Sequence, residues 1–154
     1  MTAADTAPLS TQLMSLVFGQ DATLNAHTNS ISDWSELEAT IRAVGGYNNF
    51  DPERVLNQLH PLFARVESVE VGRESSPVIY VNVPYWTHQQ STPTRPAGRD
   101  FGMGERIPLE ERQALADCLF DAMRNAAADE ISDERADQFG QVSSNPHRLR
   151  FWWD

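Results

Sequence analysis

Residues 67–83 read ESVEVGRESSPVIYVNV and contain two runs that are typical of β-strands. In the first run, Val69 and Val71 alternate with polar neighbours, which places both valines on one face of a strand. The second run, Val78–Val83, is rich in β-branched residues and apolar on both faces, as expected of a central strand. Only the short polar segment 72–76 separates them. The sequence therefore predicts an antiparallel hairpin near the centre of a sheet.

Two helices are predicted near the N-terminus. Leucines at helical spacing follow Pro8, which suits a helix start, and Gly19 suits its end. Asp33 and Glu36 have the spacing of an N-cap and its reciprocal partner, and an apolar stripe follows them up to Gly45. We therefore expect one helix between Pro8 and Gly19 and a second between Asp33 and Gly45.

A third helix is predicted between that region and the hairpin. Asp51 is followed by Pro52, which is the pattern of an N-cap and a first helical residue. Pro61 falls inside the apolar stripe that follows, so we expect a kink or break near His60. The polar stretch 20–32 shows no clear period and predicts no element.

The C-terminal part predicts two more helices and one more strand. Pro108 opens a helix whose apolar stripe includes Cys118, which we expect in the core. A short acidic helix is predicted over 133–139, and the alternating run 148–153 predicts a third strand. The fold class is therefore α+β, with a small antiparallel sheet of about three strands and three to five helices packed on it.

Length and composition fit a single domain. The chain has 154 residues, of which 40% are hydrophobic and 22% charged, so residues 1–154 form one domain with a flexible lead-in at 1–7. No apolar run reaches the roughly 20 residues of a membrane span. The single cysteine excludes an internal disulfide framework and favours a reducing compartment, so we expect a cytoplasmic protein.

The charge restricts the partners that the chain can bind. The formal net charge is −10, all twelve basic residues are arginine and lysine is absent, a bias that GC-rich genomes produce. Residues 109–137 alone hold nine acidic residues and three arginines. This balance disfavours nucleic acid and anionic membrane surfaces, which would be repelled. The expected partner is therefore another protein, possibly a basic one, or a second copy of the chain.

No constellation for chemistry stands out. His27, His60, His88 and His147 are isolated, without the spacing of a metal site. Acidic pairs such as Glu110 and Glu111 are adjacent, so on a helix they point in different directions. We therefore predict no catalytic residue, no metal ligand and no cofactor.

The segment 84–108 is the strongest alternative site. It holds four prolines and three glycines between a strand and a helix start, and loops of this length are usually functional or disordered. Glycines let a backbone approach an anion, arginines hold it, and His88 is the one proton carrier nearby. A loop that contacts a partner, or one that is merely floppy or packed on its own domain, is favoured over ligand binding. The candidate anion-binding residues are Arg95, Arg99, Arg106, His88, Gly102 and Gly104.

The aromatic C-terminus completes the functional hypothesis. Two of the four tryptophans lie within the last three residues, where they either complete the core or contact another chain. We favour a non-catalytic interaction module, such as an inhibitor or immunity-like protein, an adaptor or a subunit of an assembly. A small anion- or nucleotide-binding enzyme domain that uses 84–108 is the alternative. The predicted partner-binding residues are Trp152, Trp153, Arg150, Tyr85, Trp86, Asp117 and Asp121.

Overall fold

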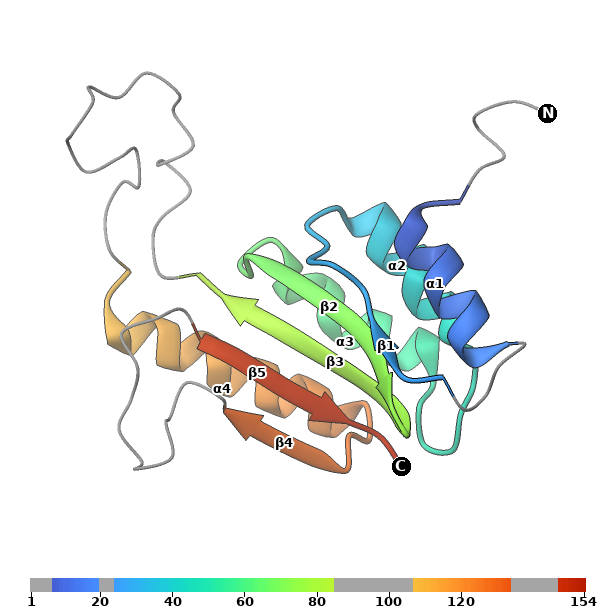
Figure 1. Cartoon of the computed structure of the whole chain (residues 1–154). Coiled ribbons are helices and arrows are strands. Elements are labelled where there is room, and N and C mark those ends of the chain that lie inside the picture. The colour runs from blue at the N-terminus through green and yellow to red at the C-terminus, as the bar shows by residue number, and fades with distance from the viewer. Residues whose placement is uncertain (1–6, 20–23, 85–106, 134–146) are drawn as a thin grey trace, which may run out of the picture.

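A five-stranded antiparallel sheet with the order β1-β2-β3-β5-β4 lies at the centre of the computed structural model, which describes residues 7–19, 24–84, 107–133 and 147–154. The helices α3 and α4 lie behind the sheet, and α1 and α2 lie beside β1 (Figure 1). The strands are β1 (Ala26–His27), β2 (Ser68–Glu74), β3 (Ser76–Val83), β4 (Glu130–Asp133) and β5 (His147–Trp152). The helices are α1 (Leu9–Phe18), α2 (Trp34–Val44), α3 (Pro52–Phe63) and α4 (Leu109–Asn125).

The core lies between the helices and one face of the sheet. Because side chains alternate along a strand, every second residue of β2, β3 and β5 points into it. The core residues that these strands contribute are Val69, Val71, Ile79, Val81, Val83, Leu149 and Phe151. Each helix adds its own apolar stripe, such as Leu37 and Ile41 from α2 or Leu115 and Leu119 from α4. Within the described ranges, no helix covers the other face of the sheet (Figure 1).

The mixed fold and the hairpin are confirmed, but the described sheet has five strands rather than three. The strands β2 and β3 pair from Ser68 and Asn82 to Glu74 and Ser76. Ser75 turns the chain between them with a φ of 66°. The missed strands are β1, which has two residues inside the stretch without a period, and β4, which has one apolar side chain in four. Such short strands carry no alternation to detect.

The capped helix starts are confirmed, and of the kink or break expected near His60 the break is wrong. The side chain of Asp33 accepts a hydrogen bond from the Glu36 N–H at 2.9 Å. Asp51 likewise accepts one from the Glu53 N–H at 3.1 Å. The helix α3 continues through His60 to Phe63. Pro61 has no backbone N–H, so it removes one hydrogen bond of the helix. Because Pro61 lies in the last turn, the helix loses little and continues for two more residues.

Two expectations for the C-terminal half are also corrected. Cys118 is exposed rather than buried. The buried arc of α4 contains Leu119, and neighbouring residues on a helix lie roughly 100° apart, so Cys118 falls outside that arc. Asp133, expected to begin a helix, is the last residue of β4. The rest of that predicted helix, and residues 1–6 of the lead-in, lie outside the described residues.

Candidate functional site

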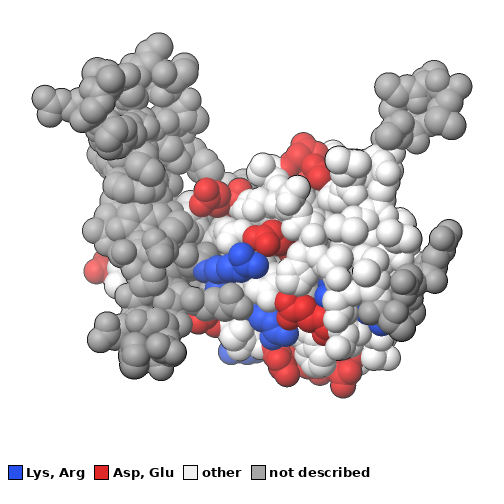
Figure 2. Space-filling model, viewed as in Figure 1, with Lys and Arg blue, Asp and Glu red and all other residues white. Residues whose placement is uncertain are grey.

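The side of the sheet away from the helices, here named the open sheet face, carries mainly polar and aromatic side chains. They come from the alternate positions of all five strands, and acidic and basic groups lie beside one another there (Figure 2). The open sheet face consists of His27, Ser68, Glu70, Gly72, Glu74, Val78, Tyr80, Asn82, Glu130, Ser132, Arg148, Arg150 and Trp152.

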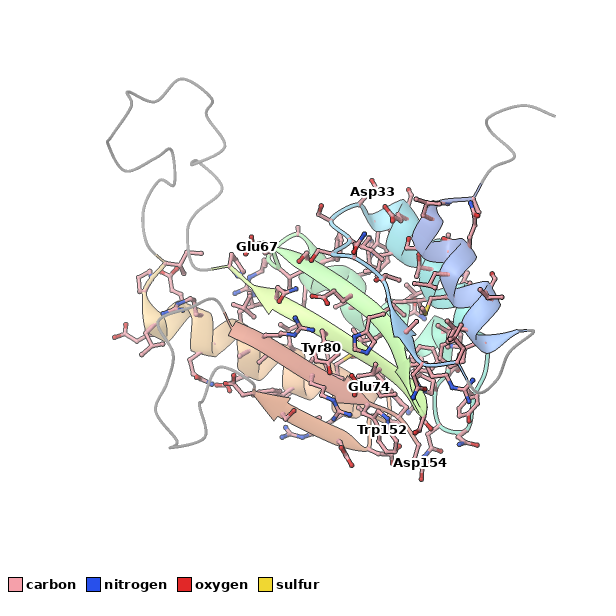
Figure 3. The ribbon with its side chains drawn as sticks, viewed as in Figure 1. Asp33, Glu67, Glu74, Tyr80, Trp152 and Asp154 are labelled. Carbon is pink, nitrogen blue, oxygen red and sulfur yellow. The ribbon has the colours of Figure 1, made fainter. Side chains whose placement is uncertain are left out.

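Glu74 receives more hydrogen bonds than its neighbours on this face, and they come from side chains of three other strands. Its Oε2 accepts a hydrogen bond from the Tyr80 hydroxyl at 2.6 Å and lies 2.9 Å from the His27 Nε2. Its Oε1 accepts from the Arg150 Nε and Nη2 at 3.0 and 2.8 Å. Its backbone oxygen accepts from the Trp152 indole N–H at 2.9 Å. Glu74 therefore ties the end of the hairpin to β1 and β5 (Figure 3).

The protonation of this cluster follows from these contacts. Burial acts to raise the pKa of Glu74, but the hydrogen bonds from Tyr80 and Arg150 and the charge of Arg150 hold it below its usual range. For Arg150, burial acts to lower the pKa, and the hydrogen bonds to Glu74 and Glu130 outweigh burial and raise it. At neutral pH the pair is therefore a charged, hydrogen-bonded salt bridge.

A second cluster covers the ring of Tyr80. The guanidinium of Arg148 lies 4.2 Å from the centre of that ring and 3.2 Å from Glu70 Oε1. The His27 ring lies 5.3 Å from Tyr80, and it crosses Gly72 so closely that a Cβ at Gly72 would collide with it. Only 6% of Tyr80 is exposed. The ring is therefore packed under charged side chains and does not form a bare platform for stacking a base.

One end of the open sheet face combines a partly accessible tryptophan with carboxylates. Trp152 is half-buried and faces Glu130 across β4 and β5. The Glu130 side chain is 61% exposed. The Asp129 N–H donates to the Trp152 backbone oxygen at 2.8 Å, and the Asp154 N–H donates to Asp129 Oδ2 at 2.8 Å. We name Glu74, Asp129, Glu130, Trp152 and Asp154 the acidic corner; Figure 3 labels three of them at one end of the sheet.

The predicted residues at the C-terminus divide between the two faces. Arg150 and Trp152 lie on the open sheet face. Trp153 is fully buried, donates its indole N–H to the Ala126 backbone oxygen at 2.8 Å and packs edge-on against Phe50 at 5.0 Å. The expectation that Trp153 contacts a partner is therefore wrong, because its side chain completes the core.

The predicted acidic residues of α4 lie on another side of the molecule. Asp117 and Asp121 are exposed, and they point away from the buried stripe through Leu119 that packs toward the sheet. Asp117 accepts a hydrogen bond from Gln113 at 3.1 Å, and Asp121 accepts one from Arg124 at 3.3 Å. The acidic face of α4 and Trp152, both predicted to bind a partner, therefore lie on different sides of the described part of the molecule.

The predicted residues of the segment 84–108 are not placed. Tyr85, Trp86, His88, Arg95, Arg99, Gly102, Gly104 and Arg106 all lie outside the described residues. A hollow of about 330 Å³ lies between the ends of α3 and β3 and the start of α4, with Arg65, Glu111 and Arg112 in its lining. The anion-binding hypothesis for this segment stays a prediction.

Three important residues were missed from the sequence. Tyr80 was taken as part of a central strand that is apolar on both faces, and the strand is indeed buried, but Tyr80 also shares one side of β3 with the polar Asn82 and bonds Glu74. Glu74 was counted as part of a polar turn. His27 lies in a two-residue strand and contacts Glu74 only because β1 pairs with β2 in the folded chain. The alternation of Tyr80 with Ile79 and Val81 was the one available signal for a polar face.

Comparison with protein-family models, curated proteins and solved structures finds no match to this chain. In the part of the chain that the structure describes, no three histidine, cysteine, aspartate or glutamate side chains gather as a group that could hold a metal ion. None of the helices in those ranges has both the length and the apolar character needed to cross a membrane.

Proposed function

We propose that this chain is a non-catalytic interaction module that binds a basic partner protein at the acidic corner. The observation that carries the proposal is the position of Trp152, which is half-buried opposite the exposed side chain of Glu130 and bonded through its main chain to Asp129. Tryptophans that are held in place and ringed by polar groups dominate the energetics of many interfaces. An acidic surround favours a partner that presents arginine or lysine, which also stack on an indole.

The contacts of Trp152 support this role because they fix the indole before a partner arrives. Its N–H donates to the Glu74 backbone oxygen at 2.9 Å, and its neighbour Arg150 is held by Glu74 and Glu130. A fixed side chain loses little rotamer entropy on binding, so more of the contact energy appears as affinity. Inhibitor, adaptor and assembly-subunit roles all agree with such a surface.

The net charge of −10 supports the same partner class at longer range. Surface charge steers an oppositely charged partner toward the molecule and raises the association rate, and added salt screens the effect. Under this proposal Asp117 and Asp121 contribute to steering without touching the partner. The direct contacts belong to the acidic corner.

Site-specific photo-crosslinking tests the proposal. The photoreactive residue p-benzoylphenylalanine replaces Ser132, which is exposed on the open sheet face beside the acidic corner, and the chain is expressed in its native host. We expect one basic protein to be captured, with capture lost on Trp152→Ala and reduced by high salt. The matched control places the same photoreactive residue at Asp117 on the outer face of α4. Equal capture from both positions, capture that survives Trp152→Ala, or an acidic captured protein would each contradict the proposal.

A further inference from the structure

A cavity of about 390 Å³ lies at the β1 edge of the sheet, and β4 and the acidic corner lie at the opposite edge. Its walls come from the N-terminal halves of α1 and α2 and from the segment that begins at His27 and runs on to Ser30. Every residue of these walls belongs to the described part of the chain, and none belongs to the acidic corner. The volume lies within the range of pockets that bind small molecules.

The charged group on the cavity wall is the carboxylate of Glu36. Its spacing from Asp33 predicts that this carboxylate bonds back to the start of its own helix, as in a capping box. Instead, its Oε2 accepts a hydrogen bond from the Ser10 hydroxyl of α1 at 2.5 Å. No other hydrogen bond or ion pair joins the Glu36 carboxylate to a described residue. The other ionisable residue of the wall, His27, binds Glu74 through Nε2 at 2.9 Å. The wall therefore offers a carboxylate whose Oε1 is open to a cation.

Hydrogen bonds hold the polar groups of the cavity in position. Ser10 Oγ lies 3.0 Å from Thr40 Oγ1, and Thr40 donates to the Glu36 backbone oxygen at 2.6 Å. Ser10 and Thr40 are both buried, so this network joins α1 to α2 beside the carboxylate. On the other wall, the Thr28 N–H donates to the Val71 backbone oxygen at 2.9 Å, and Thr28 Oγ1 accepts from the Val71 N–H at 3.1 Å. Because these groups are fixed in advance, a ligand loses little affinity to ordering the protein.

Leu9 and Leu13 form the apolar part of the cavity wall. Residues four apart share one face of a helix, so the two side chains are neighbours on α1. Leu9 is 82% exposed, more than any other large apolar residue that the structure describes, and Leu13 is only partly buried against the core. Apolar area next to a carboxylate favours a ligand that combines an alkyl chain with a cation, because the chain removes this area from water.

We propose that this cavity binds a small primary alkylamine, with its ammonium group at Glu36 and its alkyl chain along Leu9 and Leu13. An ammonium is a compact charge with three donors, so it suits separate oxygens such as Glu36 Oε1, Ser10 Oγ and Thr28 Oγ1. A guanidinium is a planar fork that prefers both oxygens of a carboxylate, and Ser10 already binds one of them here. The net charge of −10 attracts cations to the molecule in general. This proposal does not rest on the proposed function, because the two sites share no residue.

A titration followed by NMR tests the proposal on the full chain. The probe is pentylamine, added at constant salt to the isotope-labelled protein while the backbone amide signals of residues 9–13 and 27–30 are recorded. We expect these signals to move and to saturate. The alcohol n-pentanol has the same chain length and no charge, so it should bind about tenfold more weakly, the loss of one charge-assisted hydrogen bond. This comparison uses only the wild-type chain, so it does not depend on the folding of a variant.

Three variants locate the amine in the cavity. Glu36→Gln keeps an acceptor for Ser10 and removes the charge, so pentylamine should bind about tenfold more weakly. Glu38→Gln is the matched control, because it removes the same charge from the same helix outside the cavity, where Glu38 lies 3.5 Å from Arg42. Its affinity for pentylamine should be unchanged. Leu9→Ser should weaken binding roughly threefold and leave the fold intact, because Leu9 is largely in water.

The contrary outcomes are distinct. Equal binding of pentylamine and n-pentanol would show that only the apolar wall attracts the probe, and equal losses in Glu36→Gln and Glu38→Gln would show a general attraction to the net charge. Either result, or signals of residues 9–13 and 27–30 that do not move, would overturn the proposal. A glycyl-lysyl-glycine peptide that binds more tightly than pentylamine and depends on Glu36 would identify a site for a protein side chain and overturn the small-molecule ligand. None of these results affects the proposed function, which rests on Trp152.

Discussion

Two neighbouring tryptophans at the end of β5 show how the same residue type serves different purposes on the two faces of one sheet. Trp153 is fully buried, and its indole N–H bonds to Ala126. Trp152 is half-buried, and its indole N–H bonds to Glu74. Both indoles have a partner for the N–H, so the difference lies in what covers the rings. Trp153 lies in the core and packs against Phe50, whereas Trp152 lies on the open sheet face between Val78 and Glu130 of the neighbouring strands.

The largest effect is expected from removal of the buried indole. Trp153→Ala should lower the free energy of unfolding by about 3–5 kcal/mol, because it leaves a large cavity beside Phe50. The Ala126 backbone oxygen also loses its donor. Urea denaturation followed by circular dichroism measures the change. The matched variant Trp152→Ala should cost clearly less, and equal losses would show that the two faces do not differ as described.

A smaller loss of stability is expected from Glu74→Gln. The amide keeps one acceptor for Tyr80, but the charge that binds Arg150 and His27 is lost. Loss of charge-assisted hydrogen bonds at a partly buried site should cost about 1–3 kcal/mol in the same denaturation experiment. Glu67→Gln is a control that removes a carboxylate of the exposed surface outside the cluster. A Glu74→Gln variant as stable as that control would contradict a central role for Glu74.

The lowered pKa of Glu74 adds a dependence on pH. A carboxyl group whose folded pKa lies below its unfolded value of 4.5 stabilises the fold above that pH. This contribution is lost as the pH falls through the folded pKa. The difference in stability between the wild-type chain and Glu74→Gln should therefore be full at neutral pH and shrink in acid below about 4.5. Urea midpoints measured across that range give the difference curve, and a constant difference would refute the assignment.

The sequence was informative where local pattern decides structure. The hairpin follows from the alternation around Val69 and the branched run at Ile79, and the caps follow from Asp33 and Asp51. The alternation of β5 also separates the two tryptophans, since Trp153 shares its phase with Leu149 and Phe151, and Trp152 with the arginines. The error was to assign both indoles to one surface.

The sequence was uninformative where the site depends on distant contacts. Glu74 meets Arg150 across a separation of 76 residues, and it meets His27 from a two-residue strand. The local spacing of polar and apolar residues cannot predict these contacts, because they depend on the strand order and on the register of each strand pair. The order β1-β2-β3-β5-β4 brings these residues together only after the whole sheet has formed.

The smallest effect is expected from an ion pair on the exposed surface whose donor–acceptor distances match those of Arg150 and Glu74. Arg42 donates to the Glu53 carboxylate at 2.8 and 3.0 Å, as Arg150 does to Glu74 at 2.8 and 3.0 Å. The hydrogen bond from Arg42 lowers the pKa of Glu53, yet both side chains are largely in water. Solvent screens such pairs, so a double-mutant cycle with Arg42→Gln and Glu53→Gln should give a coupling within experimental error. The same cycle on Arg150 and Glu74 should give a clear coupling, because the neighbours His27, Tyr80 and Trp152 hold the second pair in place. Equal couplings in the two cycles would mean that the donor–acceptor distances, and not the packed surroundings on the open sheet face, determine the contribution to stability.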